Sequence, residues 1–579
     1  MPKQQKSFME VPLFIPRSKV STEINKTGSW RFVSPMFEEK TAPCSAACPA
    51  GEDIGRIEML TAQGLFKRAW EAILMENPFP SVCGRICFHP CENFCNRKEF
   101  DESIALHSLE RFLGDIAIAE GLNQPLKNLP ANGKKIAIAG AGPAGLSAAF
   151  FLTRLGYSCT IFEEKSEPGG ILRWGIPSYR LPDDILKSEI KRILDSGVEI
   201  RCNTPVTKSF MEKEIGYYDA FFIGSGHSIS IKMDVYGEDA ASDGLKFLYN
   251  IRKGEITSIN CTAAVIGGGN TAIDVSRSLI RLGANVILMY RRRRQDMPAF
   301  ANEVEMALKE GVQLMELVSP IGLEKDGKNL LLTLQKMKIA DTLSGGRPQV
   351  VPDSTKTETL RVGKIFAAVG AGPDKLWQIP CEDKDDNKIL RLSHCIISIE
   401  KYPKIFAGDL TNHTKSAVDA IASGKQAAMA LDILFNEGRD SIKERLSSCK
   451  VGDGPALSME IYMNGKRKSR NSRIVYLKDI NTDYFMPALR IIPLSLSPEL
   501  CIKSFSQVEQ TLTTDSAMKE ASRCFNCGLC NNCDNCRLFC PEMAVISEDN
   551  NRRINFDYCK GCGICVVECP RSAMALKEE

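Results

Sequence analysis

Near the C-terminus, four cysteines recur twice at one spacing, and this repeat constrains the fold more than any other feature. The first run is Cys530-x2-Cys533-x2-Cys536-x3-Cys540-Pro541, and the second is Cys559-x2-Cys562-x2-Cys565-x3-Cys569-Pro570. Three thiolates of such a run hold one [4Fe–4S] cluster, and the fourth crosses to the other cluster. The spacing therefore predicts one cluster on Cys530, Cys533, Cys536 and Cys569, and another on Cys559, Cys562, Cys565 and Cys540.

Two such runs are the signature of a bacterial-type ferredoxin domain. The alternatives are zinc ribbons or disulfides, but zinc sites rarely need four evenly spaced thiolates followed by proline. Most of the 23 cysteines fall in tight groups with metal-ligand spacing. That favours iron–sulfur sites in a reducing cytoplasm over disulfides, and it suggests anaerobic metabolism.

Bulk properties exclude several classes of protein. A chain of 579 residues should hold three or four domains. Lys and Arg total 74 against 71 Asp and Glu, so no strong field attracts nucleic acid or an anionic membrane. The N-terminal residues lack the apolar region of a signal peptide, and no apolar run approaches the length of a membrane span. We expect a cytoplasmic protein.

A first dinucleotide site is predicted around residues 135–163. An apolar strand runs into Gly140-x-Gly142-Pro143-Ala144-Gly145, where the glycines allow a tight turn, close approach to a pyrophosphate and close helix–strand packing. The pyrophosphate would sit on the following helix N-terminus. Glu163 ends the next strand, where a carboxylate accepts hydrogen bonds from ribose hydroxyls.

Three later segments favour FAD at this first site. Residues 168–173, PGGILR, lie where a flavoprotein chain passes the isoalloxazine. A strand ends in a Gly-Asp pair. Such a pair typically binds the ribityl or phosphate region of FAD, although the pair alone could be an ordinary turn. A Ser-Ala-Val sequence then opens a helix that can face the flavin ring. The residues predicted to contact FAD in these segments are Gly170, Leu172, Arg173, Gly408, Asp409, Ser416, Ala417 and Val418.

A second dinucleotide site is predicted at Gly267-x-Gly269-Asn270-Thr271-Ala272. The next strand ends in Arg291 and Arg292 rather than in an acid, so the site favours the 2′-phosphate of NADP(H). If the arginines are only a series of solvated surface charges, NAD(H) is an alternative nucleotide for this site. Because this site follows the first, its domain is predicted to be inserted into the FAD domain. The segments Gly224-x-Gly226 and Gly370-x-Gly372 would form the crossings.

The N-terminal cysteines resemble those of a family that includes the glutamate synthase small subunit, the N-terminal half of dihydropyrimidine dehydrogenase and the large subunit of NADH-dependent ferredoxin:NADP transhydrogenase. The resemblance covers roughly residues 35–435. It rests on CSAACP, on CGRICFHPCENFC, and on the motifs GAGPAG, PGGILRWGIP, GGGNTAID and YRRRRQDMPA. It implies a helical N-terminal domain with two [4Fe–4S] clusters.

Carried over by position, the resemblance implies one cluster on Cys48, Cys87, Cys91 and the non-thiolate ligand Glu110. The other cluster would use Cys44, Cys95 and an upstream Cys-x2-Cys pair, but Met36 and Glu39 occupy the pair's expected positions. EASRCFNCG, at residues 520–528, looks like the missing motif moved along the chain. We hypothesise that Cys524 and Cys527 complete this cluster, which would give four clusters in all. The alternatives are a lone surface CxxC, or no cluster at Cys44 and Cys95.

Cys83 has no ligand counterpart in the family and is interpreted as structural. His89 would pack against a cluster or tune it rather than ligate it. Together the motifs predict a multidomain α/β protein. Its predicted parts are a helical iron–sulfur domain (1–130), an FAD domain (131–258 and 362–435), an inserted NAD(P) domain (259–361), a wrapping linker (436–520) and a ferredoxin domain (521–579).

The predicted function is electron transfer between NAD(P)H and one-electron carriers, because a flavin can take two electrons and release them singly. We nominate no catalytic acid or base. The chain has no room for an acceptor domain, so a partner redox subunit in a hetero-oligomeric complex, or ferredoxin, is expected. One alternative is an electron-bifurcating transhydrogenase-type subunit. Another is a non-catalytic wiring subunit with a vestigial nicotinamide site.

Overall fold

The structure is a computed structural model. It describes residues 24–122, 124, 126–214, 216–344, 347–377, 388–399, 401–465, 467, 469–470, 473–548 and 551–579. The chain divides into two compact units. The larger unit comprises residues 41–477 and 486–526, and the smaller unit comprises residues 1–40, 478–485 and 527–579. Among the described residues, no helix has both the length and the apolar composition needed to cross a bilayer.

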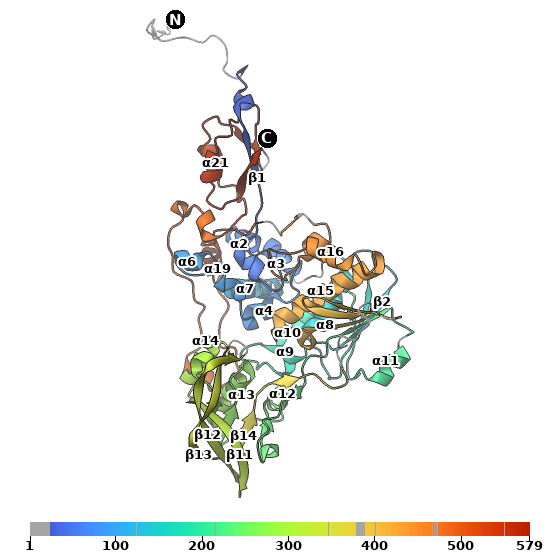
Figure 1. Ribbon diagram of the computed structural model, residues 1–579, viewed down its shortest axis with the longest axis vertical. Helices are drawn as coiled ribbons and strands as arrows, with labels where there is room; N and C mark the ends of the chain where they lie inside the picture. The colour runs from blue at the N-terminus through green and yellow to red at the C-terminus, as the bar shows by residue number, and fades with distance from the viewer. Residues whose placement is uncertain are drawn as a thin grey trace, which may run out of the picture. The chain divides into compact units, whose positions relative to one another are not determined.

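The larger unit begins with a helical layer that carries the N-terminal cysteines (Figure 1). Its cysteines lie at helix ends: Cys44 is in α1, and Cys48 and Cys87 follow the last residues of α1 and α4. The helices are α1 (Pro43–Ala47), α2 (Ile54–Ala62), α3 (Phe66–Leu74), α4 (Pro80–Ile86), α5 (Pro90–Asn93), α6 (Arg97–Phe100) and α7 (Leu106–Ala119).

A seven-stranded sheet forms the predicted FAD-binding part, in the order β16-β17-β18-β5-β2-β3-β4. Strands β18 to β4 are parallel, and β16 and β17 continue the sheet antiparallel. Helices α8 (Pro143–Arg154) and α15 (Ala417–Asn436) pack against each other and bury most of their residues. The strands are β2 (Lys135–Ala139), β3 (Ser158–Phe162), β4 (Glu199–Arg201), β5 (Ala220–Ile223), β16 (Ile389–Arg391), β17 (Cys395–Ser398) and β18 (Lys404–Ala407). Two helices, α9 (Ile171–Trp174) and α10 (Asp183–Asp195), lie between β3 and β4.

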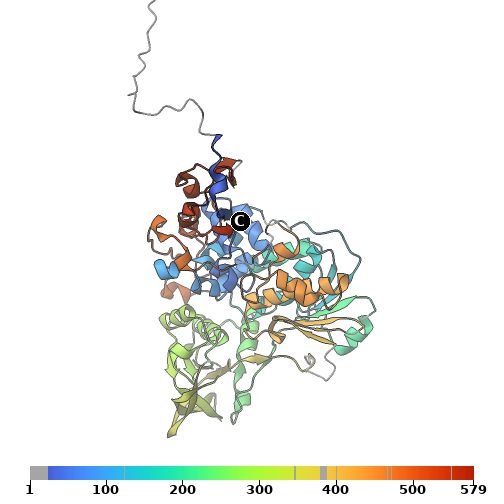
Figure 2. The same ribbon diagram turned by 45° about the horizontal axis from the view of Figure 1, so that its top comes forward.

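The second dinucleotide motif builds its own parallel sheet, in the order β10-β9-β8-β14-β7. The sheet takes strands from both sides of the predicted range 259–361, because β7 (Ser242–Asp243) precedes the range and β14 (Lys364–Ala367) follows it. The other strands are β8 (Thr262–Ile266), β9 (Asn285–Tyr290) and β10 (Gln313–Glu316), with helices α12 (Gly244–Arg252), α13 (Asn270–Arg281) and α14 (Ala301–Lys309). A second, antiparallel sheet of β11 (Val318–Asp326), β12 (Asn329–Ser344) and β13 (Arg347–Val362) extends beyond it in both ribbon views (Figure 2).

The second predicted crossing segment, Gly370-x-Gly372, pairs with residues that follow the first segment, Gly224-x-Gly226. Strand β6 (Ile229–Ser230) lies antiparallel to β15 (Ala371–Gly372), with Ile229 opposite Gly372. This short ladder lies where the chain leaves the first sheet and returns to it.

Most of the predicted linker belongs to the larger unit, as residues 436–477 and 486–520, whereas residues 478–485 belong to the smaller unit. The linker contains α16 (Ile442–Ser448), α17 (Met459–Tyr462), α18 (Pro498–Cys501) and most of α19 (Thr514–Ser522). Buried Glu76 accepts hydrogen bonds from Lys425 Nζ (2.6 Å) and from Ser458 Oγ (2.5 Å). This network therefore ties α15 and the loop before α17 to the N-terminal helices.

The smaller unit contains the C-terminal cysteine runs. Strand β1 (Val33–Phe37) pairs antiparallel with β21 (Met574–Glu578), and β19 (Val545–Glu548) pairs with β20 (Asn551–Ile554). Two short helices, α20 (Asn535–Leu538) and α21 (Ile564–Val567), each carry the third cysteine of a run. Its core consists of Ala544, Val545, Ile554 and Met574 with cysteines Cys536, Cys559 and Cys565.

Candidate functional site

The first glycine turn has the geometry of a dinucleotide cradle. Gly140 has φ 97°, and a Cβ on Gly145 would lie 2.0 Å from the Gly140 carbonyl oxygen, so the turn and the helix require both glycines. Gly142 differs, because nothing lies within 4 Å of the position its Cβ would take. Pro143 and Ala144 follow as the first residues of α8. The structure thus leaves open space at the helix N-terminus, which fits a pyrophosphate.

Glu163 lies directly after β3 and is bound to the same turn. Its Oε2 accepts a hydrogen bond from Ala141 N at 2.7 Å, and its Oε1 accepts one from Lys165 N at 2.9 Å. Burial raises the pKa of Glu163. Each carboxylate oxygen has a second lone pair, so Glu163 can still accept a hydrogen bond from a ribose hydroxyl.

The later flavin segments meet α8 at the same edge of the sheet. Gly408 N donates to Ser423 Oγ at 2.8 Å, and a Cβ on Gly408 would lie 2.9 Å from the Cβ of Ala144. Ser416 caps α15 by accepting a hydrogen bond from Asp419 N at 3.1 Å. Burial raises the pKa of Asp409. The predicted FAD residues in these segments therefore lie around one helix pair; Ala417 and Val418 begin α15, and Gly170, Leu172 and Arg173 lie at α9.

The second glycine turn repeats this arrangement in the other sheet. A Cβ on Gly267 would lie 2.3 Å from the Ala368 carbonyl oxygen, whereas Gly269 faces open space. Asn270 and Thr271 begin α13, and Ala272 is fully buried. Asn270 Oδ1 accepts a hydrogen bond from Phe300 N at 3.0 Å.

The two arginines after β9 have different surroundings. Arg291 is exposed to solvent. Arg292 is 7% exposed, and its Nε donates to the Pro348 carbonyl oxygen at 2.7 Å. Of the two, Arg291 is thus the guanidinium that a bound nucleotide could recruit without breaking an existing contact.

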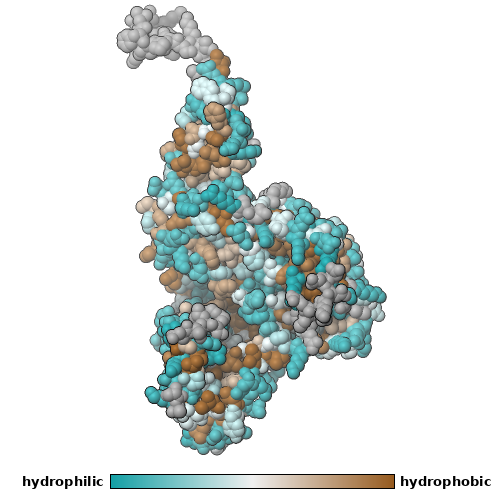
Figure 3. All heavy atoms as spheres, in the orientation of Figure 1, coloured by the Kyte–Doolittle hydropathy of each residue, from teal (hydrophilic) through white to brown (hydrophobic). Residues whose placement is uncertain are grey.

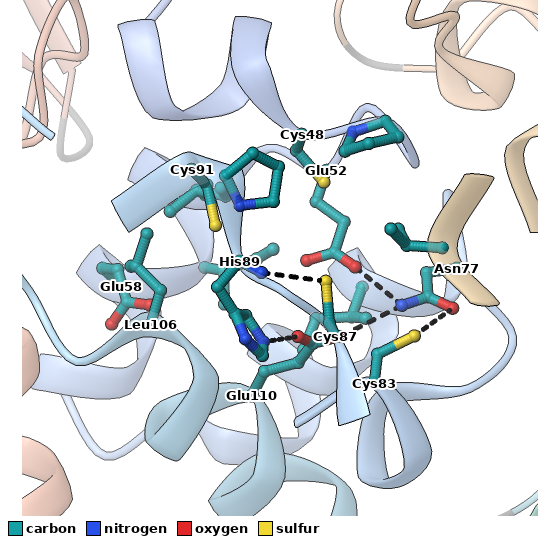
Figure 4. A pocket seen from close by; sticks show the side chains of 16 residues that line it. Cys48, Glu52, Glu58, Asn77, Cys83, Cys87, His89, Cys91, Leu106 and Glu110 are labelled. Carbon is teal, nitrogen blue, oxygen red and sulfur yellow. Dashed lines mark hydrogen bonds and ion pairs between the residues drawn. The ribbon is translucent and has the colours of Figure 1, made fainter. Parts of the chain in front are cut away.

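Among the N-terminal helices, one pocket collects four of the residues carried over from the family (Figure 4). Cys48, Cys87, Cys91 and Glu110 all line it, together with Cys83. Three thiols and a carboxylate facing one cavity fit a [4Fe–4S] cluster with one non-thiolate ligand. Val418, from the start of α15, lines the same pocket, so the helix predicted to face the flavin also borders the cysteines.

A buried amide orients the carboxylates of this pocket, which we name the Cys48 pocket. Asn77 Nδ2 donates to Glu52 Oε1 at 2.8 Å and to Glu110 Oε1 at 3.0 Å. Burial, and then the charge of Glu52, raises the pKa of Glu110 well above its usual value. His89 Nε2 lies 3.6 Å from Glu110 Oε2, and burial lowers the pKa of His89 to about 3. Neither Asn77 nor Glu52 carried a sequence signal.

The 514–526 segment is anchored to the N-terminal helices beside Cys95. α19 packs against α2 and α7, and Glu520 Oε1 accepts a hydrogen bond from Ala105 N at 2.9 Å. Arg97, two residues after Cys95, donates to the Arg523 carbonyl oxygen at 2.9 Å. These contacts hold Cys524 in the same unit as Cys44 and Cys95, whereas Cys527 begins the C-terminal stretch of the other unit.

In the smaller unit, one cavity is lined by Cys530, Cys533, Cys536 and Cys569. This grouping joins three cysteines of the first run to the last cysteine of the second. The remaining cysteines lie near one another and near Cys536: burial, and then the charges of Cys559, Cys536, Cys562 and Cys540, raises the pKa of Cys565 to about 12. The structure thus brings together the four thiols of the first predicted set, and the second set stays a prediction.

Backbone N–H groups point at several of the candidate ligand sulfurs. Cys87 accepts a hydrogen bond from His89 N at 3.3 Å, and Cys524 accepts one from Asn526 N at 3.3 Å; His89 and Asn526 both have positive φ. Cys540 and Cys569 accept hydrogen bonds from the residue four positions on, Ala544 N and Ala573 N, both at 3.3 Å. By contrast, Cys501 donates to the Leu496 carbonyl oxygen. N–H groups aimed at sulfur stabilise thiolates and tune clusters, so Cys524 has ligand-like surroundings.

Comparison with known proteins agrees with this arrangement. Residues 134–424 match the pyridine nucleotide-disulphide oxidoreductase family, residues 37–122 match dihydropyrimidine dehydrogenase domain II with its 4Fe-4S cluster, and residues 552–575 match the 4Fe-4S binding domain. The NADP(+)-dependent formate dehydrogenase subunit beta of Moorella thermoacetica is 33% identical over 532 residues, which cover 84% of this chain and 70% of that protein.

Two further relatives match shorter regions. The NADPH-Fe(3+) oxidoreductase subunit beta of Geobacter sulfurreducens is 36% identical over 352 residues, covering 58% of this chain and 52% of that protein. The NAD-dependent dihydropyrimidine dehydrogenase subunit PreT of Escherichia coli O157:H7 is 32% identical over 401 residues, covering 67% of this chain and 90% of that protein. The chain therefore belongs to the pyridine nucleotide-disulphide oxidoreductase family.

The matches confirm the predicted fold class and cofactor classes: FAD, a nicotinamide nucleotide and [4Fe–4S] clusters. The protein is an FAD-dependent NAD(P)H oxidoreductase, and iron–sulfur domains precede and follow its flavoprotein part in the sequence. The assignment of individual residues to each cofactor stays a prediction, as do the domain boundaries.

Proposed function

We propose that this chain links NADPH oxidation to one-electron transfer within a complex of redox subunits. Bound FAD would accept two electrons as hydride and release them one at a time. The observation that carries the proposal is Val418, which begins the helix predicted to face the flavin and also lines the Cys48 pocket. The FAD site and the first iron–sulfur site would therefore share one element.

In this proposal, Gly142, Glu163 and the α15 N-terminus hold FAD, and Gly269 with α13 holds the nicotinamide nucleotide. Cys48, Cys87, Cys91 and Glu110 hold one cluster. Cys44, Cys95 and Cys524 hold a second cluster. Its fourth ligand is Cys527, which is assigned from the EASRCFNCG motif. The two sets of four thiols in the smaller unit hold the remaining two clusters.

An anaerobic titration tests the proposal. NADPH should bleach the flavin absorbance and bring up EPR signals of reduced clusters, since the hydride pair is passed on as single electrons. NADH, titrated separately, should act only at much higher concentration. Flavin that bleaches without any cluster signal would contradict the link between the two sites. No bleaching by either nucleotide would contradict the direction of transfer.

The choice of NADPH rests on Arg291. Two of the three relatives described above carry NADP(+) or NADPH in their names, and the third carries NAD. Replacing Arg291 with alanine should raise the KM for NADPH by roughly 10- to 150-fold, because a charge-assisted hydrogen bond contributes about 1.5–3 kcal/mol. The KM for NADH should change little. Steady-state kinetics with an artificial acceptor would measure both.

A matched control is Arg361→Ala, which removes an exposed arginine paired with Asp326 from the neighbouring sheet. This variant should keep both KM values. Equal losses for NADPH and NADH in Arg291→Ala would contradict a role at the 2′-phosphate.

The partner is proposed to be another redox subunit, since two of the relatives are named as beta subunits. The smaller unit exposes Cys533 and Cys562 along with large apolar side chains, which give brown areas in Figure 3. Those side chains include Leu538, Met543 and Val567, between 69% and 83% exposed. Such a surface suits protein contact beside one-electron carriers. Purification from native cells should recover a heteromeric complex; a lone chain with full activity towards soluble ferredoxin would contradict it.

A further inference from the structure

The Cys48 pocket contains an acid that the proposed function leaves unused. Glu58, on α2, lines the pocket and is 2% exposed (Figure 4). Its Oε2 has no hydrogen-bond partner within the part of the chain that the structure describes. It is not a carried-over ligand, and nothing in the sequence singled it out.

Other buried acids of this domain have donors. Glu76 accepts hydrogen bonds from Lys425 and Ser458, and Glu520 binds Arg523 Nη1 at 2.6 Å. Glu52 is bonded to Asn77. Glu58 alone among these four acids leaves a buried oxygen without a partner. A buried polar atom without a partner calls for an explanation, and a group bound in the pocket would supply one.

The charges that most affect Glu58 are those of other carboxylates. Burial, and then the charges of Glu520, Glu52 and Glu92, raises the pKa of Glu58 well above its usual value. A neutral carboxyl group carries one O–H to donate, in addition to its acceptor lone pairs. The sulfur atoms of a cluster in this pocket are natural acceptors.

We propose that the Glu58 carboxyl donates a hydrogen bond to a sulfur atom of the cluster held by Cys48, Cys87 and Cys91, and so sets that cluster's reduction potential. The inference rests on the proposed function, because it requires the cluster to occupy this pocket. A donor aimed at sulfur stabilises the reduced, more negative cluster. Glu58 therefore makes the cluster a better acceptor of electrons.

Two variants separate the donor from the shape of the side chain. Glu58→Met removes the O–H and keeps a side chain of similar length, whereas Glu58→Gln keeps a neutral donor. Glu120→Gln, which changes an exposed acid at the end of α7, is the control. Full-length protein would be purified without oxygen, assayed for iron, and followed by EPR during a redox titration.

We expect the midpoint potential of one cluster to become more negative in Glu58→Met, with an altered EPR signal, and to stay near that of the wild type in Glu58→Gln and Glu120→Gln. Loss of this cluster's iron in Glu58→Met, with rescue by Glu58→Gln, would support the same role. Unchanged potentials in Glu58→Met would overturn it, and so would loss of iron in both variants. A Cys48→Ala arm tests the cluster itself: unchanged iron there would refute the proposed site and not the role of Glu58.

Discussion

Replacing Gly142 with valine is expected to give a folded protein that purifies with little or no FAD. The backbone at Gly142 has φ −78° and ψ −178°, which valine adopts readily, and the space beyond its Cα is open. The new side chain would therefore meet no protein atoms near its Cβ, but it would occupy the proposed pyrophosphate position. Overpacking of about 1–3 kcal/mol corresponds to roughly 5- to 150-fold weaker flavin binding.

Gly269→Val is the reciprocal control, because Gly269 has the same extended backbone and the same open space in the other sheet. This variant should keep its FAD and lose reduction by NADPH. Flavin content after gel filtration, circular dichroism and stopped-flow reduction would measure the outcome. Retention of full flavin in Gly142→Val would refute the first cradle. Loss of flavin in both variants would mean that valine disturbs the fold.

Both cradles could be predicted from the sequence because each is local. A strand, a glycine turn and a helix lie within about twenty residues, and their hydrogen bonds are set by that order. The grouping of Cys530, Cys533 and Cys536 with Cys569 in one cavity was predictable for a similar reason. The spacing within each run fixes three ligands, and the short distance between runs leaves one partner for the fourth.

Contacts between distant segments were not predictable. Asn77 orients Glu110, 33 residues further on, and Arg97 reaches the carbonyl of Arg523 across 426 residues. Neither the hydrophobic periodicity nor the motif spacing of the sequence indicates such pairs. Cys83 is intermediate: it lies four residues before Cys87 along α4, so helical geometry alone would have placed both thiols on one face.

The prediction of a linker at residues 436–520 likewise did not include contacts between distant segments. Residues 436–520 contain few motifs, yet Ser458 and Met459 N complete the buried Glu76–Lys425 pair. A buried ion pair needs additional hydrogen bonds to offset its desolvation. Here Ser458 Oγ and Met459 N supply them, and Arg470 of the same region lies 3.8 Å from Glu76 Oε1.

The prediction that depends most on such a distant contact concerns Cys524. Cys524→Ala should lower the iron content by about four atoms per chain, because a [4Fe–4S] cluster that lacks one of its ligands is lost or degraded. The physical basis is the anchoring of residues 520–526 by Arg97 and Ala105, together with the Asn526 N–H bond to the Cys524 sulfur. Iron and sulfide assays with EPR would count the clusters in the variant and in the wild type.

Cys501→Ala is the matched control, since Cys501 is 1% exposed and belongs to an apolar cluster with Tyr179 and Val508. It should keep all its iron, although it will lose some stability. If Cys524→Ala also keeps its iron, the EASRCFNCG segment has a structural role. Cys524 then shares no cluster with Cys44 and Cys95. If iron falls and the flavin is still bleached by NADPH, the missing cluster lies beyond the flavin on the electron path. That result would assign this second N-terminal site to electron delivery and not to hydride acceptance.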